Sequence, residues 1–251
     1  MEIPMKRLAI ALIPLFFCAA LLIAVPGSAG AAPALEQYTK TGADPSGSSV
    51  SLTLNGVKPG SLLVVSVRAS AENSPTCSDD RGGKWTTHVY AKSGYGHSHV
   101  ICSSPNAAGG NTRVTVTSSG GSTYWRMILA EFSGVAASSY VTDVSQSSGS
   151  SGSANSGSVA TGSDALIFFA ATSDGDAWGE SPGSFSPSPG YVSIDCAGKK
   201  NGAAYKVISA GTAYGTVSAG QPWTAGIVAF KTAGGSVAMP SPPLDLHLLG
   251  Q

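Results

Sequence analysis

The feature that most restricts the fold of this chain is a series of short apolar or alternating runs separated by turn-forming residues. Residues 61–67 form a continuous aliphatic and β-branched run, whereas residues 112–117 alternate strictly between polar and apolar side chains. The first pattern is typical of a buried strand, and the second of a strand with one solvated face. Further runs of strand length occupy 125–132, 165–172 and 225–230.

Clusters of Gly, Pro, Asn, Asp and Ser lie between these runs, at residues 79–83, 106–111 and 186–190. Such clusters are turn signals, and beyond residue 32 no stretch shows the 3.6-residue periodicity of an amphipathic helix. The pattern predicts an all-β protein. We expect a single, jelly-roll-like β-sandwich.

An internal repeat indicates that this sandwich has two pseudo-equivalent halves. A tryptophan precedes a phenylalanine by seven residues at 125–132 and again at 223–230, and the strand at 62–65 has a counterpart at 166–169. The offset is close to 100 residues. Between the halves we expect Gln146–Ser158, which is rich in Gly and Ser, to be a flexible stretch.

Two arrangements fit this repeat: one sandwich built from both halves, or two small domains on a linker. Each half contains few strand signals for independent stability, which favours the single sandwich. We therefore expect one domain over residues 33–234 and a Pro- and Leu-containing tail over residues 235–251. The tail is expected to dock on its own domain or on the sheet edge of a partner.

The first 32 residues have the pattern of a secretory signal peptide. Lys6 and Arg7 precede an uncharged apolar run of 18 residues, Leu8–Val25, and small residues follow it. Such a run could also span a bilayer, but Pro14 and the small-residue exit favour cleavage near Ala31 or Ala32. We therefore expect a secreted or cell-surface protein with no stable membrane insertion after cleavage.

Charge excludes two classes of partner. Residues 33–251 contain 12 basic and 13 acidic side chains, so the mature chain is nearly neutral. It has no basic footprint for nucleic acid and no polybasic face for a membrane surface.

The mature chain retains three cysteines, Cys77, Cys102 and Cys196. An oxidising compartment favours disulfides, and Cys77 and Cys102 flank a segment that resembles a hairpin turning near Gly94 and Gly96. We predict a Cys77–Cys102 bridge that holds the loop at Asp79 and Asp80 against this hairpin. Cys196 is then a free thiol, either buried or available for an intermolecular bridge.

The order of several segments resembles a widespread family of exported bacterial proteins. The matching segments lie between Gly60 and Lys231 and include G-G-N-T-x-V-T-V-T, E-F-S-G-V and P-W-T-A-x-I-V-A-F-K. Family members occur alone or beside immunoglobulin-like repeats. The resemblance implies a jelly-roll-like sandwich and no particular activity.

Signatures of common catalytic sites are missing: the chain has no G-x-S-x-G, H-E-x-x-H, C-x-x-C or P-loop sequence. The remaining catalytic candidates are carboxylates. Glu131 lies in a predicted strand and could act with Glu180 or Asp195 as a glycosidase acid/base pair, if the carboxyl groups lie roughly 5–10 Å apart.

Two segments could bind a metal ion. His97 and His99 are two apart on a predicted strand, so both imidazoles would point to one face, and Asp79 and Asp80 could add oxygen ligands. Asp174, Asp176 and Glu180 place three carboxylates in one loop, the ligand type that calcium prefers. Solvated histidines and a solvated acidic turn are the alternatives. We expect no cofactor, with calcium as the alternative.

Aromatic residues in predicted loops could stack on sugar rings. The candidates are Tyr90, Tyr95, Trp178 and Tyr191. The predicted export, the fold class and the missing catalytic motifs favour a non-catalytic binding or adhesion module, with a glycan or a cell-surface protein as partner. The alternatives are a secreted hydrolase that acts on polysaccharide and a structural subunit of a surface assembly.

Overall fold

The computed structural model describes residues 31–234, except for residues 43, 71–72, 151 and 182. The predicted signal peptide (apart from residues 31 and 32) and the tail 235–251 lie outside the described residues. The regular secondary structure of the described part consists of β-strands alone, which confirms the all-β class. No helix in this part has the length and apolarity that a bilayer span requires.

The strands fall into two halves, and they include all the apolar and alternating runs predicted from the sequence. The first half contains β1 (Ala34–Lys40), β2 (Ser46–Gly47), β3 (Ser49–Val57), β4 (Leu62–Ala69), β5 (Pro75–Asp79), β6 (Thr86–Lys92), β7 (Ser98–Ser104), β8 (Gly110–Ser118) and β9 (Thr123–Ser133). The second half contains β10 (Val141–Gly149), β11 (Ser153–Thr161), β12 (Ala165–Ser173), β13 (Val192–Ala197), β14 (Asn201–Ile208), β15 (Gly211–Ser218) and β16 (Trp223–Lys231).

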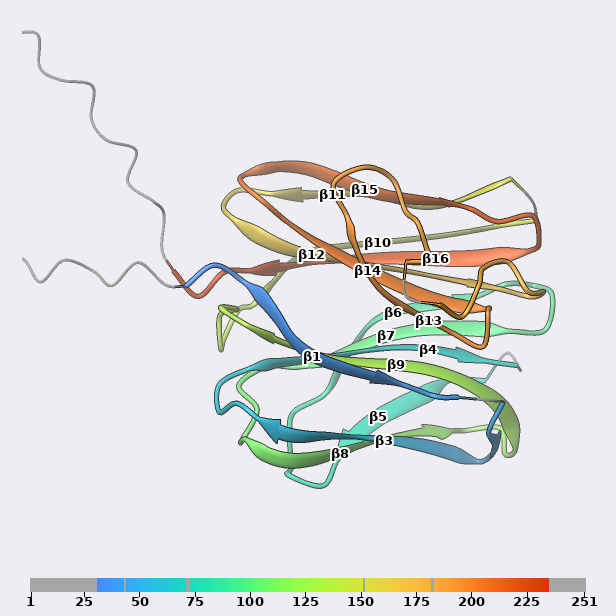
Figure 1. Cartoon of the computed structure of the whole chain (residues 1–251), viewed down its shortest axis with the longest axis horizontal. Coiled ribbons are helices and arrows are strands. Elements are labelled where there is room, and N and C mark those ends of the chain that lie inside the picture. The colour runs from blue at the N-terminus through green and yellow to red at the C-terminus, as the bar shows by residue number, and fades with distance from the viewer. Residues whose placement is uncertain (1–30, 43, 71–72, 151, 182, 235–251) are drawn as a thin grey trace, which may run out of the picture.

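Each half is a two-layer sandwich made of a large and a small antiparallel sheet. In the first half the large sheet has the order β1-β9-β4-β7-β6 and the small sheet the order β3-β8-β5. In the second half the orders are β10-β16-β12-β14-β13 and β11-β15. Figure 1 shows the resulting stack of four layers, in which the two large sheets face each other at the centre and the small sheets lie outside.

Strand register confirms the internal repeat. Leu62 lies opposite Phe132 in the β4–β9 pair, and Leu166 lies opposite Phe230 in the β12–β16 pair. The large sheets also have corresponding strand orders, so the fold consists of two pseudo-equivalent halves, each of them a sandwich.

The expectation of a flexible stretch over Gln146–Ser158 is wrong. Most of this segment belongs to β10 and β11, which lie inside the second half. Its small side chains alternate between buried and exposed positions, and Ala154 and Ser156 are fully buried on β11. Strand periodicity therefore outweighs the Gly/Ser composition, and the halves are instead joined by residues 134–140.

A shared apolar core joins the halves. Phe132 and Phe168 meet edge to face with ring centroids 6.3 Å apart, and Leu62, Leu166 and Phe230 belong to the same buried cluster. Burying a side chain of this size contributes roughly 1.5–3 kcal/mol, so this layer is a major source of stability. Separate apolar clusters fill the space between the large and small sheet of each half.

Polar side chains fix the position of the two large sheets relative to each other. Ser66 Oγ donates to Asn201 Oδ1 at 2.8 Å and lies 3.2 Å from His99 Nε2, and Asn201 Nδ2 donates to the carbonyls of Ser66 and Arg126 at 3.0 Å. Because the Ser66 proton is used on Asn201, His99 Nε2 carries the proton that completes this network. Buried polar groups need such partners, so the network allows one relative position of the halves.

The edges of the large sheets are linked in a pseudo-symmetric way. Lys40 lies opposite Ile128 on β9, and Gln146 lies opposite Gly226 on β16, so the two side chains occupy corresponding positions. Lys40 Nζ donates to Asp195 Oδ1 at 2.7 Å and to the Cys196 carbonyl at 3.0 Å. The Gln146 amide accepts from Tyr90 N and donates to Tyr90 O on the opposite edge.

The predicted Cys77–Cys102 disulfide is present, with the two Cα atoms 6.5 Å apart. Cys102 lies on β7, whose hairpin with β6 turns at residues 93–97 as expected. Cys77 lies on β5 in the small sheet, so the bridge connects the two sheets of the first half. Cys196 is a buried free cysteine, and burial raises the pKa of its thiol to about 12.

Removal of the disulfide is expected to destabilise the protein. In the chain-entropy model, a bridge across a separation of 25 residues contributes about 3 kcal/mol. The double variant Cys77→Ala/Cys102→Ala should lose roughly this much free energy of unfolding in urea titrations. Dithiothreitol should destabilise the wild type and leave the double variant unchanged; equal effects on both would contradict the assignment.

Buried histidines predict acid sensitivity. Burial lowers the pKa of His97 and His99 to about 3 and that of His88 to about 4, so the folded protein holds them neutral. An unfolded histidine binds a proton near pH 6.5, and the unfolded state therefore gains protons as the pH falls below this value. At pH 5, His97 and His99 should each cost about 2 kcal/mol of stability relative to pH 7.5.

The measurement is urea unfolding at pH 7.5, 6 and 5, a range above the titration of ordinary carboxyl groups. The variant His99→Gln removes one titrating group, and its slope of stability against pH should be shallower than that of the wild type. A free energy of unfolding that does not change between pH 7.5 and pH 5 would show that these histidines do not titrate as described.

Candidate functional site

A difference between the halves locates the candidate site. The large sheets correspond strand for strand, but β5 has no counterpart, because residues 174–191 between β12 and β13 form no strand in their described part. In the second half, this segment instead places Trp178 and Phe185 in the core. The first half is therefore distinguished by β5, its disulfide and the loop that follows β5.

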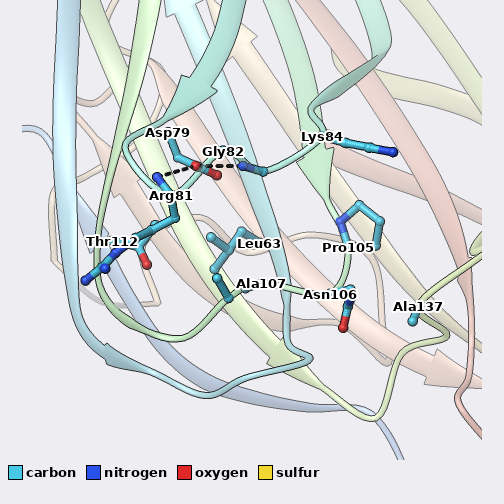
Figure 2. Close-up of a pocket in the computed structure, with 12 residues that line it drawn as sticks. Leu63, Asp79, Arg81, Gly82, Lys84, Pro105, Asn106, Ala107, Thr112 and Ala137 are labelled. Carbon is cyan, nitrogen blue, oxygen red and sulfur yellow. Dashed lines mark hydrogen bonds between the residues drawn. The ribbon is translucent and has the colours of Figure 1, made fainter.

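A pocket of about 330 Å³ lies beside this loop. The β5–β6 loop and the β7–β8 loop form most of its lining, and Ala137 from the connection between the halves completes it. The lining residues are Leu63, Asp79, Arg81, Gly82, Gly83, Lys84, Pro105, Asn106, Ala107, Ala108, Thr112 and Ala137. Figure 2 shows Arg81 near Thr112 on one side of the pocket and Lys84 near Pro105 on the other.

Asp79 organises the β5–β6 loop. Its Oδ1 accepts from the backbone N–H groups of Arg81 at 2.8 Å and Gly83 at 2.9 Å, and its Oδ2 accepts from Trp85 Nε1 at 2.8 Å. A Cβ at Gly83 would collide with the Asp79 carboxylate and lie 2.7 Å from Ser104 Oγ. The close approach of the loop to β7 thus requires glycine at this position.

The pocket has a positive rim. Among the described residues, neither Arg81 nor Lys84 forms an ion pair, and both side chains are exposed. Arg81 Nε donates to the Asn111 carbonyl at 2.9 Å, which fixes the guanidinium while its terminal nitrogens remain available. Asp79 is the single carboxylate in the lining, and both its oxygens already accept hydrogen bonds.

The four aromatic residues predicted to bind sugar lie outside this pocket, and two of them, Trp178 and Tyr191, pack in one apolar cluster of the second half. Tyr95 is 53% exposed in the β6–β7 turn, and Tyr90 is half-buried on β6, where Gln146 binds its backbone. Trp178 is 8% exposed and packs in the core of the second half, and its Nε1 donates to the Ser218 carbonyl at 2.9 Å. Tyr191 is half-buried and donates to the Tyr214 carbonyl.

The two histidines proposed as metal ligands are fully buried between the large sheets. His97 Nδ1 lies 3.7 Å from Asp174 Oδ1, whereas His99 Nε2 bonds to Ser66. The described residues contain no cluster of three or more His, Cys, Asp or Glu side chains suited to a metal ion.

The three carboxylates proposed for calcium point to different partners. Asp174 Oδ1 lies 3.3 Å from the guanidinium of Arg68, and Asp176 lies 3.7 Å from Lys199 Nζ and 3.8 Å from Lys200 Nζ. Glu180 is exposed, and its backbone carbonyl accepts from Lys40. The basic neighbours compensate the charge of both aspartates.

Glu131, the first catalytic candidate, is completely buried and has three donors. Its Oε1 accepts from Lys58 N and Ser61 Oγ, both at 2.7 Å, and its Oε2 accepts from Gln37 Nε2 at 2.6 Å. Asp195 accepts from Lys40 and from the backbone N–H of Cys196. These carboxylates hold β1, the β3–β4 turn and β13 in place.

Arg81 and Lys84 were not among the residues proposed from the sequence. The sequence predicts a turn over Asp79–Gly83. A turn prediction describes the local backbone and does not identify the segment that packs opposite the turn. The pocket depends on residues 105–108 approaching this turn, and that contact is set by the packing of β7 and by the disulfide. A disulfide cysteine two residues before an Asp-Asp-Arg-Gly-Gly turn is the signal that could have directed attention to it.

Comparisons with known proteins add no name to this site. No family model matches the chain, no curated protein matches it, and no solved structure matches its fold.

Proposed function

We propose that this chain is an exported, non-catalytic binding module that holds a saccharide in the pocket between the β5–β6 and β7–β8 loops. The pocket itself is the observation that carries the proposal. Its volume of about 330 Å³ suits one or two sugar rings and lies near the lower end of ligand sites, which span roughly 300–1,000 Å³.

The lining has the chemistry that a saccharide requires. Pro105, Ala108 and Ala137 provide apolar surface for the C–H faces of a sugar ring, whereas Leu63 and Ala107 are buried. Asn106 supplies an exposed amide that can bond to sugar hydroxyls, whereas the buried Thr112 hydroxyl already donates to the Gly110 carbonyl at 3.3 Å. Polar groups placed beside apolar surface give orientation and specificity.

The site is also held rigid before a ligand arrives. The disulfide fixes β5 to β7, and Asp79 fixes the loop that follows β5. Preformed loops lose little conformational entropy on binding, which favours affinity for a flexible sugar. The predicted signal peptide and the disulfide support an oxidising, extracytoplasmic location.

Geometry favours binding over hydrolysis. Glycosidases of the common type need two carboxyl groups on either side of the bond that is cleaved. The pocket lining provides Asp79 alone, and Glu131 is enclosed by its three donors. A polysaccharide hydrolase that uses Glu131 would have to expose a fully buried side chain.

The pocket can be tested by filling it. Ala108 is an exposed lining residue, and Ala108→Trp should block the site without changing any charge. The matched control is Ala160→Trp, an exposed alanine on β11 in the second half. On a glycan array and in calorimetry with residues 33–251, we expect Ala108→Trp to weaken saccharide binding at least about tenfold, a loss of about 1.4 kcal/mol.

The control variant should bind like the wild type. A wild-type protein that binds no saccharide on the array would contradict the proposed function. Equal binding by Ala108→Trp and the wild type would place the ligand elsewhere on the molecule.

A further inference from the structure

We infer that the pocket selects an acidic saccharide whose carboxylate groups bind Arg81 and Lys84. This inference rests on the proposed function and adds the chemical class of the ligand. It starts from the charges on the pocket rim, which the scaffold does not use.

Most other basic side chains of the described chain have a partner. Lys40, Arg68 and Arg126 pair with aspartates, and Lys58 pairs with Glu36. Lys199 and Lys200 lie near Asp176, and Lys206 lies over the ring of Tyr191. Arg81 and Lys84 differ from these basic residues, because both line a pocket and neither has an acidic partner among the described residues.

The nearby acidic residues are already engaged. Asp79 accepts three hydrogen bonds from N–H groups, and Asp80 Oδ1 accepts from the backbone N–H of Arg113 at 2.9 Å. Hydrogen-bond donors stabilise a carboxylate and disperse its charge, so these aspartates compete weakly for a guanidinium. An incoming carboxylate therefore meets two cations with free donors.

The described lining of the pocket contains no aromatic ring, which also favours a charged ligand. Neutral sugars are commonly held by stacking on Trp or Tyr, whereas the described lining of this pocket contains neither. Affinity must then come from hydrogen bonds and charge. A guanidinium anchored through Nε presents its remaining N–H groups to a planar carboxylate, and such charge-assisted bonds are about twice as strong as neutral ones.

Arg81 and Lys84 lie on opposite sides of the pocket, and their charged ends point away from each other at its rim (Figure 2). A single carboxylate contacts one side, whereas a short chain of acidic sugars can place one carboxylate near each cation. The geometry thus favours an oligosaccharide of uronic acids.

The test compares two ligands of nearly the same shape. Calorimetry on residues 33–251 is performed with digalacturonate and with its neutral methyl ester. We expect the acid to bind at least about tenfold more tightly than the ester, since each charge-assisted bond contributes roughly 1.5–3 kcal/mol. Affinity for the acid should also fall as salt is raised from about 50 mM, where charges are weakly screened, to about 500 mM, where they are strongly screened.

Two variants connect the preference to the rim. Arg81→Gln and Lys84→Gln should each reduce affinity for the acid about tenfold or more and leave affinity for the ester nearly unchanged. Lys84 has no hydrogen bond to the rest of the described protein, so Lys84→Gln stays informative if Arg81→Gln disturbs the loop. Lys92→Gln, at the other end of β6, is the charge-matched control and should bind both ligands like the wild type.

Equal affinity for acid and ester, or tighter binding of the ester, would overturn the acidic preference and leave the saccharide site intact. The acidic preference would also be overturned if Ala108→Trp lost binding to both ligands while Arg81→Gln and Lys84→Gln kept the wild-type affinity for the acid. A wild-type protein that binds neither these ligands nor any glycan on the array would overturn the proposed function itself.

Discussion

The rest of the structure depends on the apolar contact between the two large sheets. Each large sheet has two faces to cover, and in each half the small sheet covers only one of them. The other face carries Phe132, Phe168 and Phe230, and side chains of this kind can leave water only by packing on the opposite half. Burial against the partner sheet is therefore what makes the two sandwiches one structure, and the Ser66–Asn201–His99 network sets their relative position.

Pseudo-symmetry separates the scaffold from its variable parts. Some equivalent positions of the two halves carry different residues. Arg68 lies opposite Arg126 in the β4–β9 pair. The equivalent pair in the second half is Thr172 opposite Thr224. The threonines bond to each other at 2.6 Å, whereas the arginines take Asp174 and Asp44 as partners. Similarly, β5 and the disulfide are present in one half alone. Such unmatched features are where function can be added without loss of the shared core.

Sequence patterns could predict the parts of this fold that depend on local periodicity. The strands β4, β8, β9, β12 and β16 were visible as apolar or alternating runs, and the repeat was visible as a Trp–Phe spacing. The strands β10 and β11 were missed because β10 has only half-buried positions and the first buried positions of β11 hold alanine and serine, which carry little hydrophobic signal. The disulfide could be predicted from compartment and spacing. The pocket could not, since it forms where two loops distant in sequence approach each other, and Trp178 was misplaced because a loop residue can still fold into a core.

The distribution of carboxylates is the structural argument behind the proposed binding role. A catalytic carboxylate must have a free oxygen that reaches the substrate. Here the buried carboxylates are used as structural acceptors: Glu131 joins Gln37, Lys58 and Ser61, and Asp195 joins Lys40 to β13. Asp79 has the same role in the loop beside the pocket. In a nearly neutral chain, this use of acidic groups for structure leaves the cations of the pocket rim as the groups that can meet a ligand. Positive charge on a rigid rim attracts and orients an anion but supplies no general base, which is the reason that we propose recognition of an acidic sugar at this pocket.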